Sequence, residues 1–352
     1  MNTVVAIGDR RVGVGEPVFI IAEAGVNHNG DPDMARKLVD AAAEAGADCV
    51  KFQTFRTDEF FADRGQTYTY SSAEGPKTER LGEMFRRLEL PPEWHRELFE
   101  RAWQRGLIPL SSVADQQSAE IVEQAGAPAF KVASDDMVNF PLLAYLATRR
   151  KPVILSTGMA DLDEVERAVE VLRPVPVIML HCVSLYPTPD EEANLKRMVA
   201  LRERFHLPVG FSDHTLGITA ALGAVALGAV TIEKHFTLSR QLPGPDHALS
   251  ADPEEFTQLV REVRRLERML GAGSLAPGQR QAEARKEMRR TIVATQAVAP
   301  GATLTREMVA LKRAAGGGPS PLLLEQLLGR RVRASLHPGE VVTPEKLEAP
   351  SS

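Results

Sequence analysis

Polar and charged side chains stand directly after the short apolar runs of this sequence, at the points where buried strands would end. They are Glu23, Lys51, Gln53, Ser111, Ser112, Lys131, Ser134, Ser156, Thr157, His181, Ser212, Asp213, His214, Glu233, Lys234 and His235. Side chains of these types are seldom fully buried without partners. At a single position, a solvated loop residue explains the observation equally well. Because the pattern recurs after nearly every apolar run, it predicts an active site at the ends of the strands.

His214 and His235 would lie at the ends of neighbouring strands, close enough for both imidazoles to bind one metal ion. Two protein ligands leave coordination positions open, which suits a catalytic Lewis acid such as Mn, Mg, Zn or Co. Taken alone, two histidines are more often structural. No Cys/His spacing of the structural zinc type is present in the sequence.

Lys51, Lys131 and Lys234 are expected at this same end of the strands, where they would concentrate positive charge. Such a cluster suits a small polyanion that carries both carboxylate and phosphate. The alternative is a lysine that forms a Schiff base, as in a metal-free aldolase. Ser156-Thr157-Gly158 could bind phosphate through backbone amides at a helix N-terminus, although a plain N-cap explains these residues more simply.

The elements that must position these residues alternate between short apolar runs and segments of helical period. Strands are expected at 18–22, 49–52, 107–110, 130–132, 153–155, 177–180, 209–211 and 231–232. Helices are expected at 32–45, 92–104, 115–125, 139–149, 161–173, 191–204, 217–227 and 253–269. These units predict an α/β fold, a (β/α)8 TIM barrel over residues 1–270. A doubly wound sheet is the alternative, but no Gly-x-Gly-x-x-Gly turn follows the first strand.

Residues 271–290 lose the apolar period and are predicted to be a linker. Residues 291–352 are then expected to form a small α+β domain of short strands. Within it, Pro300–Glu307 and Pro338–Glu345 repeat one pattern: a Pro-Gly turn, a short strand, and a Thr that would cap a helical turn.

Composition excludes several classes of protein. The formal net charge of −5 is spread without long blocks of like charge, so no nucleic-acid partner is expected. Cys49 and Cys182 cannot form a disulfide framework, which favours a reducing cytoplasm. The charged start of the chain leaves no room for an export signal. The longest uncharged run, 215–232, is shorter than the roughly 20 apolar residues that span a bilayer, so no membrane partner is expected.

Seven segments resemble the motifs of the sialic acid synthases. They are Ala22–Gly30, Lys51–Thr54, Ser156–Met159, His181–Pro189, Gly210–Thr215, Ile232–Thr237 and Pro243–Asp246. The resemblance covers almost the whole chain. It implies a TIM barrel that condenses phosphoenolpyruvate with an N-acetylated amino sugar, followed by an antifreeze-like domain. N-acetylmannosamine is the first expectation for the sugar. Its 6-phosphate, or a di-N-acetylated 6-deoxy sugar as in legionaminic or pseudaminic acid synthesis, remains open.

The resemblance also assigns roles residue by residue. It implies that His214 and His235 bind a divalent metal, Mn first with Mg or Co as alternatives, and that Glu23 is the acid/base carboxylate, with Glu233 available for proton transfer. Phosphoenolpyruvate contacts fall on Lys51, Ser112, Lys131, Ser134, Ser156, Ser184 and Ser212. Sugar contacts fall on Gln53, Tyr186, Asp246 and Arg313.

Arg313 lies in the antifreeze-like domain, which in these synthases crosses to the partner subunit of a domain-swapped homodimer. The family pattern there is Lys-Arg-Pro-Gly, whereas this chain has Lys312-Arg313-Ala314-Ala315-Gly316. The segment 58–88 does not match the family well, and no residue is carried over from it. A barrel retained only for sugar binding is disfavoured, because the carboxylate, lysine and histidine positions are all intact.

Overall fold

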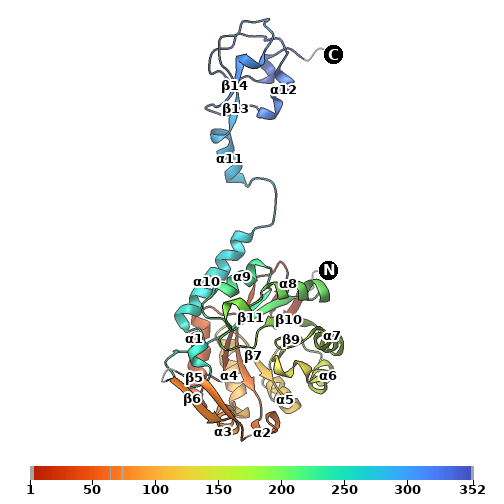
Figure 1. Cartoon of the computed structure of the whole chain (residues 1–352), viewed down its shortest axis with the longest axis vertical. Coiled ribbons are helices and arrows are strands. Elements are labelled where there is room, and N and C mark those ends of the chain that lie inside the picture. The colour runs from red at the N-terminus through yellow and green to blue at the C-terminus, as the bar shows by residue number, and fades with distance from the viewer. Residues whose placement is uncertain (1–3, 64, 73–74, 350–352) are drawn as a thin grey trace. The chain divides into compact units, whose positions relative to one another are not determined.

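The computed structural model describes residues 4–63, 65–72 and 75–349, which form two compact units, Met1–Gly271 and Ala272–Ser352. In the first unit, parallel strands close into a barrel in the order of the sequence (Figure 1). These strands are β3 (Phe19–Gly25), β4 (Cys49–Thr54), β7 (Ile108–Val113), β8 (Phe130–Val132), β9 (Val153–Ser156), β10 (Val177–Cys182), β11 (Val209–Asp213) and β12 (Thr231–His235). β12 pairs with β3, with His235 opposite Glu23. The predicted TIM barrel is confirmed.

Helices surround the barrel (Figure 1). They are α1 (Pro32–Glu44), α4 (Pro92–Gln104), α5 (Gln116–Gln124), α6 (Phe140–Thr148), α7 (Leu162–Val171), α8 (Lys196–Phe205), α9 (Thr219–Ala226) and α10 (Pro253–Leu270). Aspartate side chains cap several of them, and Asp161 forms a full capping box with Glu164. α8 begins later than predicted, because Asp190–Glu192 forms a separate 3-10 turn and Asn194 has a positive φ of 40°.

Alternate side chains of each strand point to opposite faces, which divides the core into two layers. The outer layer packs the strands against the helices, with Phe52, Phe130 and Phe211 fully buried there. The inner layer fills the amino-terminal half of the barrel, with Phe19, Ile108 and Ile178 among its members. A hairpin of β1 (Val4–Ile7) and β2 (Arg10–Gly13) adds Val5, Ile7 and Val12 to this inner layer and so closes the barrel floor.

An insertion between β4 and α4 was not anticipated from the sequence. It consists of α2 (Thr57–Phe60), the antiparallel hairpin β5 (Thr67–Ser72) and β6 (Gly75–Arg80), and α3 (Leu81–Leu88). Its own apolar cluster joins Phe55, Tyr70, Met84 and Leu88 to Val26 of the barrel, with Phe60 and Phe85 packed beside them. The insertion is therefore anchored to the loop after β3, next to the strand ends.

The second unit contains α11 (Gln279–Met288), the antiparallel pair β13 (Arg290–Ala294) and β14 (Val309–Arg313), and α12 (Leu324–Leu327) around a small apolar core. The predicted linker thus includes a helix whose side chains are exposed. Both repeats end in 3-10 turns, η4 (Arg306–Met308) and η6 (Pro344–Lys346), but among these described residues neither preceding Thr side chain accepts a capping hydrogen bond. Instead, a side-chain hydrogen bond from Thr305 lowers the pKa of Glu307, and one from Thr343 lowers that of Glu345.

Within the described residues, no helix combines the length and the apolar character needed to cross a membrane.

Buried histidines tie together the loops that surround the upper end of the barrel. His28 Nδ1 accepts from the Gly30 N–H at 3.1 Å. His247 Nε2 accepts from Asn29 Nδ2 at 2.9 Å, and its Nδ1 donates to Thr237 Oγ1 at 2.6 Å. Burial lowers the pKa of both imidazoles to about 4, with smaller contributions at His28 from neighbouring histidines. Both side chains are therefore neutral at neutral pH.

We predict that the free energy of unfolding of the barrel unit falls as the pH drops from about 6.5 to about 4, by up to about 3 kcal/mol for each of these two histidines. The folded-state pKa is depressed, so below the unfolded value the unfolded chain takes up protons that the folded chain does not. Urea titrations across this pH range measure the effect. A His28→Asn variant should show a shallower pH dependence than the wild type. A slope identical to the wild type would rule His28 out as a source.

Candidate active site

The two-residue period of the strands decides which of the predicted polar residues face the barrel interior. On β12, Glu233 and His235 share the inner face, whereas Lys234 points the other way. Lys234 Nζ donates to Asp213 Oδ2 at 2.9 Å and to the Thr215 carbonyl at 2.7 Å. The expectation that Lys234 joins the positive cluster is therefore wrong, because its charge is already paired outside the barrel interior.

The same alternation removes other candidates from the interior. His181 Nε2 contacts the Ala193 carbonyl at 2.9 Å, and its ring lies 5.5 Å from that of Phe211 in the outer core. Ser111 hydrogen-bonds Thr54 at 2.7 Å, and the Thr157 hydroxyl donates to the Leu180 carbonyl. These side chains hold strands and loops together. Their inner-facing neighbours Ser112, Ser156 and Cys182 point into the barrel.

Inside the barrel, Lys51 lies between two carboxylates. Its Nζ is 2.6 Å from Glu23 Oε2 and 3.6 Å from Glu233 Oε2, and it donates to Ser112 Oγ at 3.0 Å. Glu23 Oε1 accepts from Gln53 Nε2 at 2.9 Å, and Glu233 Oε1 accepts from Ser212 Oγ at 2.8 Å. All three charged side chains are at most 5% exposed.

A bulge in β3 makes the position of Glu23 possible. The register with β4 shifts between Glu23 and Gly25, and Gly25 has a φ of 51°. A Cβ on Gly25 would lie 3.2 Å from both Gln53 Nε2 and Glu23 Oε1. Glycine therefore allows both the positive φ and the close approach of these two side chains.

Lys131 forms a second positive group beside several hydroxyls. Its Nζ donates to Ser156 Oγ at 2.7 Å and to the Val132 carbonyl at 2.8 Å. Nearby, Ser134 Oγ accepts from the Gly158 N–H at 3.1 Å. A Cβ on Gly158 would come within 2.6 Å of Ser184 Oγ and 2.7 Å of Ser134 Oγ. Backbone and hydroxyl groups thus converge here, as in sites that bind an anion.

The environment separates the acidities of the two carboxyls. Burial raises the pKa of Glu23 to about 7, against the opposing charge of Lys51. Burial would also raise that of Glu233, but Lys131 and Lys51 together hold its pKa well below the usual range. Burial lowers the pKa of Lys131. Such a pair offers one carboxyl that can exchange a proton near neutral pH and one that stays ionised.

The two predicted metal ligands lie side by side. The ring centroids of His214 and His235 are 5.3 Å apart, and the Tyr186 ring is 4.3 Å from His214. His214 Nδ1 donates to the Val183 carbonyl at 2.8 Å. The proton is therefore on Nδ1, and the lone pair of Nε2 is available to bind a metal ion. His235 Nδ1 is buried and has no hydrogen-bond partner in the described part of the chain, with Asp246 Oδ2 3.7 Å away. These two imidazoles fit a metal site with open positions.

The described residues contain no group of three or more His, Cys, Asp and Glu side chains arranged to hold a metal ion. The protein would therefore supply two imidazoles and leave the other positions to substrate or water.

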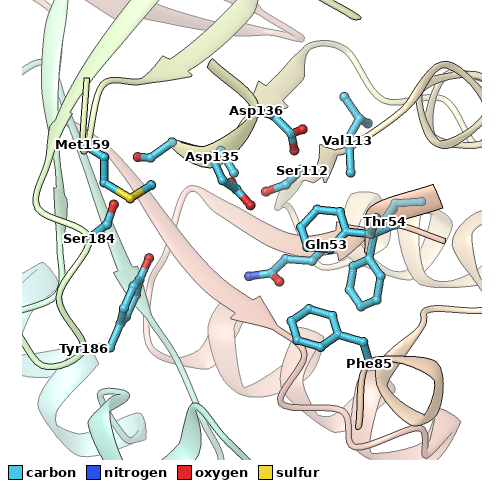
Figure 2. Close-up of a pocket in the computed structure, with 15 residues that line it drawn as sticks. Gln53, Thr54, Phe85, Ser112, Val113, Asp135, Asp136, Met159, Ser184 and Tyr186 are labelled. Carbon is cyan, nitrogen blue, oxygen red and sulfur yellow. The ribbon is translucent and has the colours of Figure 1, made fainter. Parts of the chain in front are cut away.

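Two cavities open over this cluster and share Gln53, Phe60, Phe85 and Tyr186 in their walls. The smaller, of about 320 Å³, also contains Ser112, Ser134 and Ser184. Figure 2 shows Ser184 and Tyr186 on one side of it and Gln53 and Phe85 on the other. The larger, of about 610 Å³, reaches His235 and Asp246. Arg313 is exposed on β14 of the second unit.

Sequence reasoning missed several residues of these walls. Asp135 and Asp136 line the smaller cavity (Figure 2), and Phe60, Phe61 and Phe85 of the insertion line the larger one. Four of the chain's 13 Phe residues and two of its four Tyr residues lie in the segment from Phe55 to Phe85. That concentration was a usable signal for a binding wall.

Comparison with known proteins agrees with the fold. Residues 38–275 match the model of the NeuB family, and residues 289–348 match that of the SAF domain. An uncharacterized protein of Methanocaldococcus jannaschii is 43% identical over 341 residues, which are 96% of this chain and 97% of that protein. N,N'-diacetyllegionaminic acid synthase of Legionella pneumophila is 40% identical over 338 residues, covering 94% and 95%.

Among solved structures, N-acetylneuraminic acid (sialic acid) synthetase from Leptospira borgpetersenii has a TM-score of 0.74 and 35% identity, over 82% of this chain and 98% of that one. The resemblance to sialic acid synthases predicted from the motifs is confirmed. The chain therefore belongs to the NeuB family of synthases and carries a SAF, or antifreeze-like, domain after its barrel.

Proposed function

We propose that this protein condenses phosphoenolpyruvate with N-acetylmannosamine, or a closely related N-acetylated amino sugar, and water to give N-acetylneuraminate or its analogue and phosphate. The observation that carries the proposal is the buried set of Glu23, Lys51, Lys131 and Glu233 beside the paired histidines. A synthase that uses phosphoenolpyruvate as a substrate needs buried cations to bind this trianion and a carboxyl that exchanges protons near neutral pH.

Phosphoenolpyruvate is assigned to the lysine-rich side of the cluster. Lys51 and Lys131 would bind its carboxylate and phosphate. The hydroxyls that donate around them would come from Ser112, Ser134, Ser156, Ser184 and Ser212. Of these, Ser184 Oγ is buried and lacks a partner within the described residues, so it is free to donate to an anion.

The bond changes balance without any further reactant. C3 of phosphoenolpyruvate forms the new bond to the aldehyde carbon of the open-chain sugar, whose oxygen takes up a proton. Water adds to C2 and loses one proton to Glu23, which balances the proton taken up by the aldehyde oxygen. The C2 hydroxyl then gives its remaining proton to the phosphate, which leaves as the C–O bond breaks and the keto group forms. Glu233, held ionised, stabilises the positive charge that develops at C2.

A divalent ion held by His214 and His235, Mn first with Mg or Co as alternatives, would supply Lewis-acid polarisation of the aldehyde oxygen. The protein's own contribution on that side is to place the sugar. Gln53, Tyr186 and Asp246 line the larger cavity at the point where it reaches His235. Arg313 of the partner subunit is proposed to contact the N-acetyl group across a domain-swapped homodimer.

The sugar could be the 6-phosphate, or the precursor of legionaminic or pseudaminic acid. A Schiff-base aldolase is the competing chemistry, and Lys131, whose pKa burial lowers, would be its nucleophile. Borohydride treatment in the presence of pyruvate distinguishes the two chemistries, because only a Schiff-base aldolase would become covalently labelled at its lysine. The setting we propose is the cytoplasm, which suits the free thiols of Cys49 and Cys182.

Removing the metal should abolish turnover. We expect the chelated protein to release no phosphate and Mn, Mg or Co to restore the activity. We expect the wild type to retain roughly one Mn ion per chain after dialysis, and His214→Ala and His235→Ala each to lose it. His337→Ala, an exposed histidine of the second unit, is the matched control and should bind Mn normally. Full activity of the chelated wild type would contradict the metal assignment.

Replacing Glu23 with Gln should lower kcat by about 100-fold to 10,000-fold, because the amide keeps the shape but cannot take a proton from water. The KM for phosphoenolpyruvate should change only a few-fold. Glu100→Gln, on the exposed face of α4, provides the matched control and should retain wild-type kinetics. If Glu23→Gln turned over at the wild-type rate, Glu23 would have no part in proton transfer.

If Arg313 acts in the partner's barrel, mixing two defective proteins should restore activity. Arg313→Ala and Glu23→Gln proteins, exchanged at equal amounts, form about half mixed dimers, each with one competent site of two. The mixture should recover roughly a quarter of wild-type activity. Activity no higher than the average of the two parents would mean that Arg313 does not act across subunits.

A further inference from the structure

The larger cavity has a wall of apolar side chains. Several of them come from the insertion: Phe60, Phe61, Tyr70, Met84, Phe85 and Leu88. At its inner end lie His235 and Asp246. No lysine or arginine lines it among the residues that the structure describes in the barrel unit.

The aromatic side chains form one packed group, which we call the aromatic wall: Phe60, Phe61 and Phe85. The Phe60 and Phe85 rings are stacked at 5.8 Å, and Phe61 lies edge-on to both, at 4.9 and 4.7 Å. Phe85 also meets Phe55 at 5.2 Å. Figure 2 shows Phe85 directed toward the neighbouring cavity, where it faces Gln53. Because these rings support one another, the wall has a defined shape before a ligand arrives.

Three described cations of the insertion, Lys77, Arg86 and Arg87, are paired with carboxylates. Glu79 accepts from Arg87 Nη1 at 2.9 Å and from Tyr70 at 2.5 Å, and it lies 3.3 Å from Lys77 Nζ. Arg86 pairs with Asp58 at 2.5 Å. Neither Lys77, Arg86 nor Arg87 belongs to the cavity lining. A charged group entering the cavity would therefore meet aromatic rings and the Asp246 carboxylate.

These walls discriminate between substituents of the sugar. The metal ion proposed at His214 and His235 is assigned to the aldehyde oxygen, so a phosphoryl dianion elsewhere on the sugar would lose its hydration without gaining a lysine or arginine among the described residues of the barrel unit. It would also approach Asp246, which is unfavourable. The methyl of an acetamido group or of a 6-deoxy position would instead bury apolar surface against the rings. Each such methyl group would raise the binding affinity roughly fourfold. Arg313 of the partner subunit is proposed to contact the N-acetyl group, so it is not counted as a partner for a phosphoryl group.

We propose that the aromatic wall selects an uncharged amino sugar that carries apolar substituents, such as a di-N-acetylated 6-deoxy sugar, and rejects sugar phosphates. The inference rests on the proposed function, since it names the substrate class for the same site. It assigns specificity to the insertion between β4 and α4.

Three sugars test the inference: N-acetylmannosamine, its 6-phosphate, and a di-N-acetylated 6-deoxy sugar. We expect kcat/KM, from phosphate release, to be highest for the di-N-acetylated sugar and lowest for the 6-phosphate. Phe61→Arg adds a cation at a half-buried position of the wall and should shift the preference toward the 6-phosphate by about tenfold or more. Phe61→Leu should keep the wild-type order, and Leu275→Arg, which adds the same charge at a fully exposed site outside the cavity, should leave it unchanged.

Calorimetric binding of the same sugars to the intact Mn-loaded protein separates two kinds of failure. If no sugar supports phosphate release but the binding order and its shift in Phe61→Arg are as expected, the proposed reaction is wrong and the wall still selects uncharged sugars. If phosphate release occurs but the 6-phosphate is equal or preferred, or if Phe61→Arg leaves the ratio unchanged, the inference is overturned and the synthase function stands.

Discussion

Two lysines and two glutamates lie inside the closed barrel, each at most 5% exposed, and the rest of the site depends on keeping them paired. A buried charge without a partner is costly, and breaking a buried pair typically destabilises a protein by about 3–5 kcal/mol. The barrel meets this constraint in two ways. Its lower half is filled by buried apolar side chains, including those of the amino-terminal hairpin. In its upper half, serine hydroxyls and Gln53 form hydrogen bonds with the charged groups.

The same pairing gives the two carboxyls different chemistry. Glu233 sits within the field of both lysines and remains ionised, whereas burial raises the pKa of Glu23 to near neutrality. A bound phosphoenolpyruvate would compete with Glu23 for Lys51, because Glu23 at 2.6 Å and Ser112 at 3.0 Å already engage two of the three N–H donors of the ammonium. Substrate binding would thus weaken the contact between Lys51 and Glu23. The catalytic proposal and the stability of the barrel rest on one set of contacts.

The barrel and the general location of the site were predictable from the sequence, because polar residues recur after strand-like runs. What the sequence did not decide was the face of each strand. A shift of one residue in strand phase exchanges the inner and outer sets, so Lys234 and His235 were equally good candidates until the pairing of Lys234 with Asp213 was seen. The hairpin β5–β6 was missed although Thr67-Tyr68-Thr69-Tyr70 has strand composition. The position of the hairpin depends on the apolar cluster that Tyr70 forms with Val26, a residue far away in the sequence.

The central claim is that the buried cluster acts on phosphoenolpyruvate by breaking its C–O bond. The most direct test uses phosphoenolpyruvate labelled with a heavy oxygen isotope at the bridging position, incubated with the Mn-loaded protein and an N-acetylated amino sugar. Mass spectrometry of the two products follows the label. The account predicts that the label leaves with inorganic phosphate and is absent from the sugar acid. Label retained in the sugar acid would show that the P–O bond breaks and would contradict the account.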